Sequence, residues 1–208
     1  MQVKKKRLTG EERKKQILNH AFKLIAQKGF KSISIRDIAK SAEINEALIY
    51  RHFPSKEALL TDVINEIINK SPKCPDYTPE TEAEFVGILS RFEEFFIGLN
   101  MKDPSSLKTI LYAVLENYPM PSEFNIAKEG TFLNWLDKCI IKGKNDWNFD
   151  ENVTNEISIS FFMGSLIYFI LQTSVTEAFK VDNKSIEGSF SKLFIKTLKK
   201  QNASFNEV

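Results

Sequence analysis

Side chains that can contact phosphate are concentrated in one short stretch of the chain. Arg36, Arg51 and Lys56 are cations, and Tyr50 and His52 add further hydrogen-bond donors. Such donors bind the phosphate oxygens of nucleic acids, and an arginine can also donate two hydrogen bonds to O6 and N7 of a guanine. The pattern therefore predicts contact with double-stranded DNA. A tyrosine or histidine taken singly more often packs than binds, and Tyr50 is the member of this set most open to a partly structural role.

Local helix signals can hold these side chains in place. Ser34 with Asp37 three residues later has the sequence of a capping box, and Asn45 can cap a second helix in the same way. Four apolar residues fall where two short helices would cross: Ile38, Ala39, Ile44 and Ile49. A longer support helix is expected from about Thr9 to Lys28. Together these signals predict a helix-turn-helix.

Positive charge is concentrated in the N-terminal quarter of the chain. Residues 1–53 hold 13 Lys or Arg and 5 Asp or Glu, a balance of +8; the remaining residues hold 16 and 22, a balance of −6, and the sum is the net charge of +2. A basic surface attracts the phosphate backbone and releases its counterions on contact. The run Lys4, Lys5, Lys6 and Arg7 fits either a DNA-binding arm or a solvated tail, since basic arms are common.

Helix signals continue through the rest of the chain and strand signals are nearly absent, so the sequence predicts an all-α fold. Ser55 begins a fourth helix after the helix-ending Pro54. Three prolines between Ser71 and Pro79 mark a break that the sequence favours as a domain boundary, after which the apolar periodicity of helices returns. The two cysteines, Cys74 and Cys139, have no C-x-x-C spacing, and the N-terminus lacks an apolar leader, so a reducing cytoplasm is expected.

The segment from Ile157 to Leu171 is apolar on nearly every face and is expected to be buried all round. A membrane span needs about 20 mostly apolar residues, and Ser158, Ser160 and Ser165 argue against that interpretation, so no membrane partner is expected. The last helix has a single apolar stripe between residues 186 and 198. Two such helices from each of two chains would form a four-helix interface in a homodimer.

Residues 9 to about 62 resemble the DNA-binding domain of the TetR family of bacterial transcriptional regulators. The resemblance lies in Ser34-x-Arg-Asp-Ile-Ala39 and in Leu48-Ile-Tyr-Arg-His-Phe-x-Ser-Lys-Glu-x-Leu59. It implies a three-helix DNA-binding head, placed in residues 1–54, and a larger helical effector-binding and dimerisation domain, placed in residues 55–208. It also implies that the recognition helix, from Asn45 to His52, lies in the major groove.

The positions expected to contact DNA are the basic arm and the polar face of the helix-turn-helix: Lys4, Lys5, Lys6, Arg7, Ser34, Arg36, Asn45, Glu46, Leu48, Tyr50, Arg51, His52 and Lys56. Glu43 stands where the family commonly has a turn glycine; in a left-handed conformation it costs about 1 kcal/mol. Glu46 can accept from cytosine N4 or repel phosphate, and Leu48 can only touch a thymine methyl. The operator sequence therefore cannot be deduced.

Aromatic residues in the larger domain suggest an apolar effector, although each one taken singly is more often core than pocket. The candidate pocket residues are Phe92, Phe96, Tyr112, Trp135, Phe162 and Phe169. An effector that moved the fourth helix, Ser55 to Lys70, would change the separation of two heads and so release the DNA. The expected function is a dimeric, ligand-responsive repressor of a palindromic operator.

Two other functions compete with a repressor. A DNA-binding activator, or a regulator controlled by a protein partner, would share the same head. An enzyme is disfavoured because the chain has only His20 and His52 as histidines, and has no metal-ligand spacing, no G-x-S-x-G motif and no phosphate-binding glycine loop. No cofactor and no metal are expected.

Overall fold

The computed structural model describes residues 8–120, 128–176, 178, 186 and 188–200. Within those ranges the regular elements are helices, accompanied by one isolated bridge between Phe149 and Lys199, so the all-α prediction is confirmed. The chain divides into two compact units. The first unit, the head, contains residues 1–70 and 105–121, and the second contains residues 71–104 and 122–208.

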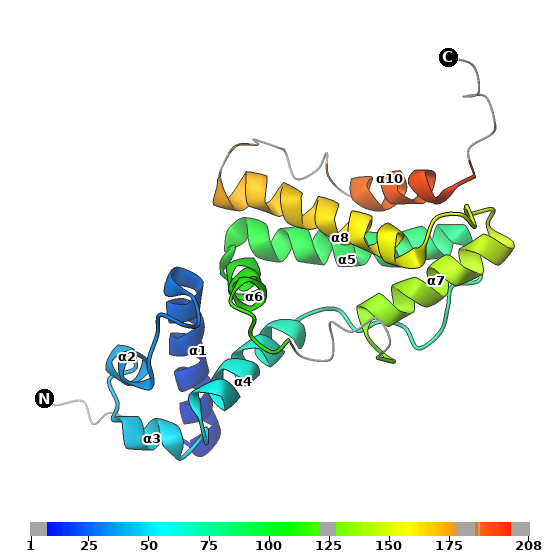
Figure 1. Cartoon of the computed structure of the whole chain (residues 1–208). Helices are drawn as coiled ribbons and strands as arrows, with labels where there is room; N and C mark the ends of the chain where they lie inside the picture. Colours follow the sequence, from blue (N-terminus) through cyan, green and yellow to red (C-terminus); the bar gives the residue numbers. More distant parts are fainter. Residues whose placement is uncertain (1–7, 121–127, 177, 179–185, 187, 201–208) are drawn as a thin grey trace, which may run out of the picture. The chain divides into compact units, whose positions relative to one another are not determined.

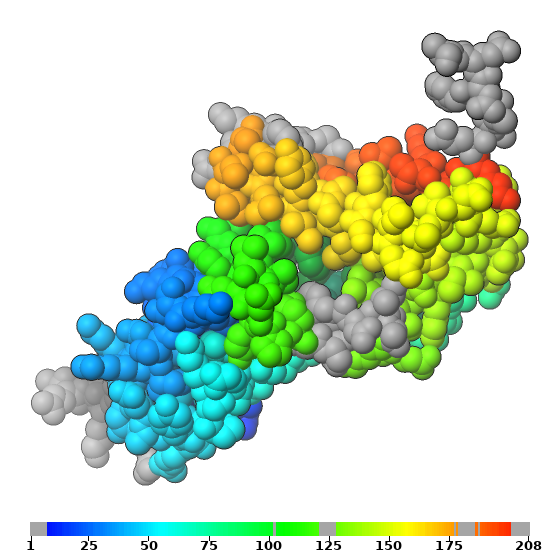
Figure 2. Space-filling model, in the orientation of Figure 1, coloured from blue at the N-terminus to red at the C-terminus, as the bar shows by residue number. Residues whose placement is uncertain are grey.

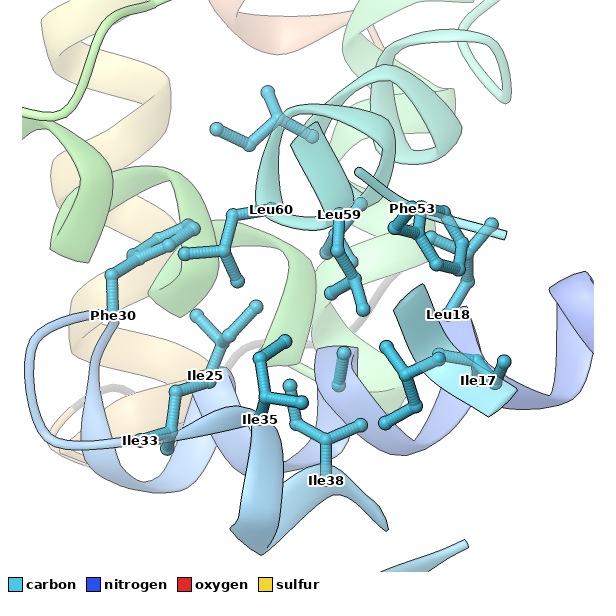
Figure 3. Close-up of a cluster of buried hydrophobic side chains, with 14 of the residues drawn as sticks. Ile17, Leu18, Ile25, Phe30, Ile33, Ile35, Ile38, Phe53, Leu59 and Leu60 are labelled. Carbon is cyan, nitrogen blue, oxygen red and sulfur yellow. The ribbon is translucent and has the colours of Figure 1, made fainter. Parts of the chain in front are cut away.

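The head is built from five helices of the described chain: α1 (Gly10–Lys28), α2 (Ile35–Ser41), α3 (Glu46–Tyr50), α4 (Lys56–Ile68) and α6 (Ser105–Leu115) (Figure 1). Figure 3 shows their shared core, in which Ile17 and Ile25 of α1 meet Ile38 of α2 and Leu59 of α4. These four side chains are fully buried. At about 25 cal/mol per Å² of apolar surface, such burial is the main force that holds the short helices together.

The ends of α1 follow from its sequence. Thr9 and Glu12 form a complete capping box at its start. The helix stops at Gly29, whose φ of 80° favours glycine. A Cβ on Gly29 would also lie 2.3 Å from the carboxylate of Glu116 and 3.1 Å from the ring of Tyr112, so α6 and the residues after it approach the α1 backbone closely at this point.

α4 and α6 belong to the head by packing, although the expected division placed both in the second domain. Leu59, Leu60, Val63 and Ile64 of α4 and Ala113 of α6 all lie in the head core. In the space-filling view, the green atoms of α6 lie against those of α1 and α4 (Figure 2). The first stretch of the head ends at residue 70, directly before the break at Ser71 to Pro79, whereas the family resemblance placed the boundary after residue 54. The apolar face of α4 completes the head core.

The second unit contains α5 (Glu82–Lys102), α7 (Phe132–Asp146), α8 (Asn155–Ile170), a short π-helix η2 (Leu171–Val175) and α10 (Ser189–Leu198). α5 contacts both α8 and α10, which also contact each other, and α7 packs on α8 (Figure 1). Phe85 of α5 stacks on Trp147 and meets Phe149, with ring centroids 5.5 and 6.5 Å away. These three rings pack together next to the first turn of α5.

The prediction that residues 157–171 are buried all round is wrong for the single chain. Ile159, Phe162 and Leu166 are buried against the neighbouring helices. Ile157 is 63% exposed and Tyr168 is 58% exposed. α5, α7 and α10 contact α8, yet these side chains on its other side remain at least half exposed. By length and composition alone, residues 155–175 could also cross a membrane, a test that core helices pass as well.

Candidate nucleic-acid interface

The start of α2 is fixed by hydrogen bonds within a capping box. The backbone N–H of Asp37 donates to the hydroxyl of Ser34 at 3.2 Å, and the backbone N–H of Ser34 donates to the Asp37 carboxylate at 2.8 Å. The Ser34 hydroxyl also donates to that carboxylate at 2.6 Å. The hydrogen bonds from Ser34, first from its hydroxyl and then from its backbone, hold the pKa of Asp37 below its ordinary value. Ser34 therefore serves the helix before any DNA is bound.

The turn between α2 and α3 contains a non-glycine residue in the left-handed conformation, as the sequence analysis considered for Glu43. Glu43 has a φ of 54°, in the left-handed region where glycine is favoured. The N–H of Ile44 donates to the carbonyl of Ala39 at 3.0 Å and closes the turn. Asn45 then begins α3, because its Oδ1 accepts from the N–H of Leu48 at 2.8 Å. The predicted helix-turn-helix is present with both predicted caps.

The outer face of α2 and α3 carries the side chains expected to touch DNA. Ile38 and Ile49 point into the core with no exposed surface. Arg36 and Arg51 are exposed, and Tyr50 is 52% exposed, so the tyrosine is not a core residue of the isolated chain. Glu46 is exposed as well, whereas Leu48 and His52 are half-buried. The structure thus brings one anionic, one apolar and several donor side chains together around a five-residue helix.

Lys56 has a structural partner that sequence reasoning missed. Its Nζ donates to the carbonyl of Phe30 at 2.8 Å and so connects the start of α4 to the turn after α1. The start of α4 is itself capped by Ser55, whose hydroxyl accepts from the N–H of Ala58 at 3.1 Å. An ammonium group has three donors, so this bond leaves two for a phosphate.

Lys40 is a further candidate contact that the sequence analysis did not single out. It is exposed and lies four residues after Arg36 on α2, a spacing that places both cations on one side of the helix. That spacing was readable from the sequence. The basic arm, Lys4 to Arg7, falls outside the described residues.

The six candidate pocket residues do not form a single cluster in the structure. Phe92 and Trp135 have ring centroids 6.3 Å apart, and Phe132 lies between α5 and α7 with them. Phe162 and Phe169 instead contact two rings of α10, Phe194 and Phe190. Phe96 is half-buried on α5, and Tyr112 packs against the core of the head.

Cysteine chemistry is disfavoured in the second unit. Burial raises the pKa of the Cys74 thiol to about 11 and that of Cys139 to about 12. The thiolate is the nucleophilic form of cysteine, and little of it exists near neutral pH at such values.

Comparison with known proteins places the head in a family. Residues 17–63 match the family of bacterial regulatory proteins described as the tetR family. The chain is 44% identical over 61 residues to YuxN of Bacillus subtilis (strain 168), an uncharacterised HTH-type transcriptional regulator; this match covers 29% of the chain and 21% of YuxN.

Longer matches extend into the second unit. The HTH-type transcriptional regulator EthR of Mycolicibacterium smegmatis (strain ATCC 700084 / mc(2)155) is 38% identical over 131 residues, or 62% of this chain and 58% of EthR. The chain therefore matches about a fifth of YuxN and little more than half of EthR.

A solved structure shares the fold over most of the chain. The crystal structure of a TetR family transcription regulator from Marinobacter aquaeolei VT8 matches 88% of this chain and 93% of its own, with a TM-score of 0.69 and 19% identity. The motif, the family match over residues 17–63 and the helical fold agree with one another, and together they support a TetR-family transcriptional regulator.

Proposed function

We propose that the protein is a transcriptional repressor that binds a palindromic operator as a homodimer and is released by a small apolar effector. The observation that carries this proposal is the helix-turn-helix, in which both helices are capped and Arg36, Tyr50 and Arg51 lie on the exposed side. Preformed caps fix the direction of these side chains before DNA arrives, which lowers the conformational entropy cost of binding.

Each exposed side chain has a defined chemical role in this proposal. Arg36 and Arg51 can contact phosphate or donate two hydrogen bonds to a guanine, and Tyr50 can donate to a phosphate oxygen. Lys40 adds a phosphate contact one turn along α2 from Arg36. Glu46 disfavours phosphate and can accept from a cytosine amino group, so it would orient α3 toward the bases.

The exposed apolar face of α8 supports pairing with a second copy of the chain. Ile157, Phe161 and Tyr168 are each at least half exposed, and their spacing of four and seven residues places them along one side of the helix. Leu193 of α10 adds an exposed apolar side chain. Apolar surface of this kind is stabilised when a partner covers it. In the dimer each subunit would contribute α8 and α10, as the four-helix interface expected from the sequence requires.

Contacts of the residues after α6 connect them to two other parts of the head. The carboxylate of Glu116 accepts from the N–H of Lys31 at 2.7 Å, just before α2. The hydroxyl of Tyr118 donates to the carbonyl of Glu57 at 2.7 Å, in the first turn of α4, and its ring stacks on Phe30 with centroids 4.8 Å apart. Partial burial raises the pKa of Tyr118, so the hydroxyl keeps its proton. A displacement of α6 would therefore move both the α1–α2 turn and α4.

The effector would be apolar because several aromatic rings cluster in the apolar interior of the second unit. Phe92, Phe132 and Trp135 contact one another between α5 and α7, with Phe92 and Phe132 only 4.2 Å apart. An apolar compound that separated these rings would replace ring contacts with contacts of the same kind. That exchange costs little free energy compared with the burial of a polar ligand.

The proposal is tested by selecting genomic DNA fragments with the purified protein and mapping the protected site. We expect a palindromic site that overlaps a promoter, binding that weakens steeply with salt, and release by at least one compound in a panel of lipophilic ligands. Binding sites upstream of the polymerase footprint would favour an activator instead. Absence of any preferred DNA fragment at low salt would contradict the proposal.

A further inference from the structure

α10 begins without a side-chain cap of its own. The residue at its N-cap position is Gly188, which has a φ of 65° and no side chain that could accept a hydrogen bond. The first N–H groups of a helix have no partner within the helix, so a buried helix start needs acceptors from elsewhere. In this structure the acceptor comes from α5, where the side chain of Glu93 is completely buried.

Both carboxylate oxygens of Glu93 are engaged by the first turn of α10. Oε1 accepts from the N–H of Phe190 at 3.2 Å. Oε2 accepts from the N–H of Ser191 at 2.8 Å and from its hydroxyl at 2.6 Å. An ionised carboxylate only accepts hydrogen bonds, and the start of a helix favours negative charge. Glu93 is therefore a cap for α10, supplied from 97 residues earlier in the chain.

The other end of α10 is attached to the same helix. Lys199, directly after the end of α10, forms an ion pair with Glu82 at the start of α5 and donates to the carbonyl of Trp147 at 2.8 Å. The N–H of Asp150 donates to the carbonyl of Leu198 at 2.7 Å. Glu82 and Glu93 lie about three helical turns apart on α5. With one attachment at each end, α10 cannot slide along α5 without breaking hydrogen bonds.

We propose that Glu93 is the positioning residue that sets the register of α10 in the surface through which two copies of the chain pair. This inference depends on the dimer proposed above. Leu193 is 56% exposed and follows the buried Ser191 by two residues, so the helix that Glu93 holds from inside presents an apolar side chain outside. A slip of one residue would move α10 by about 1.5 Å and turn Leu193 by about 100°. Leu193 would then no longer face the same partner surface.

The substitution Glu93→Gln tests this role, because it keeps the shape but replaces one acceptor oxygen by an amide NH2 that faces N–H donors. Glu94→Gln is the matched control, since Glu94 is the next residue on α5 and is exposed. In sedimentation of the full-length protein, we expect Glu93→Gln to raise the dimer dissociation constant about tenfold or more and Glu94→Gln to leave it unchanged. Amide hydrogen exchange should accelerate at residues 189–198 but not along α1.

The outcomes separate this inference from the proposed dimer. A folded Glu93→Gln protein with the same dissociation constant and exchange as Glu94→Gln would overturn the role of Glu93. If the unaltered protein sediments as a monomer, the dimer itself is wrong and the pairing role of Glu93 falls with it. If Glu93→Gln does not fold, Ser191→Ala decides the matter, since it removes only the hydroxyl bond. A smaller increase in the same dissociation constant supports the inference, and no increase overturns it.

Discussion

The outer face of α2–α3 and the outer face of α8–α10 are both exposed, yet they are built from opposite kinds of side chain. The first presents Arg36, Tyr50 and Arg51, and the second presents Phe161 and Leu193. A charged face can remain in water until a charged partner arrives, whereas an apolar face gains free energy only when it is covered. The proposed partners match this difference, since DNA would bind the head reversibly and a second copy of the chain would cover the apolar face.

The largest expected effect tests the apolar face. Phe161→Glu places a carboxylate in the centre of the proposed pairing surface, and we expect the dimer dissociation constant to rise at least about a hundredfold, because aromatic residues dominate interface energies and an unpaired buried charge is costly. DNA affinity should fall with it, since the half-sites would be bound by separate heads. Ile141→Glu is the control, because Ile141 is 48% exposed on α7. Equal sedimentation of both variants would remove α8 from the interface.

A buried position in the second unit should affect stability without involving either face. A Cβ on Gly143 would lie 2.1 Å from the ring of Phe149, which is fully buried and packs against Phe85 and Trp147. The ring would have to move, and Gly143→Ala should cost about 3 kcal/mol in the free energy of unfolding by denaturant. Gly98→Ala on α5, where the added Cβ meets nothing, should instead stabilise the protein by about 0.5 to 1 kcal/mol. Similar effects of the two substitutions would refute this account of the packing.

The charged face is tested by Arg51→Ala. We expect DNA affinity to fall by about 1 to 3 kcal/mol, with loss of preference at one base pair if Arg51 contacts a base and a flatter salt dependence if it contacts phosphate. Arg91→Ala is the control for charge, because Arg91 is exposed on α5 in the second unit. Fluorescence anisotropy with an operator fragment and with unrelated DNA distinguishes the two contacts. Unchanged affinity for both fragments would show that Arg51 faces away from the DNA.

Sequence reasoning was most successful where the structure depends on neighbouring residues. Ser34, Asp37 and Asn45 cap helices within three residues of themselves, so their roles were predictable and are confirmed. The all-α fold followed from periodicity for the same reason.

Contacts between distant residues were not predictable in this way. Glu93 and Glu116 act on residues 85 to 98 positions away, and nothing in their local sequence indicates those partners. The exposed side of α8 was mispredicted because apolar composition does not reveal how many neighbours a helix has. The assignment of α4 to the head likewise required knowledge of which core its apolar side chains fill.

The smallest expected effect concerns the turn that positions the charged face. Glu43 is held at a φ of 54°, and a left-handed conformation costs an ordinary residue about 1 to 2 kcal/mol. Glu43→Gly removes that cost. It also increases the conformational entropy of the unfolded chain, which lowers the gain in stability by about 0.4 to 1 kcal/mol. We therefore expect a net stabilisation of up to about 1.6 kcal/mol in denaturant unfolding. Glu43→Gln keeps the strain and removes only the charge, so the difference in stability between the two variants measures the backbone cost. If Glu43→Gln stabilised the protein as much as Glu43→Gly, repulsion involving the carboxylate, and not backbone strain, would be the cost carried by this turn.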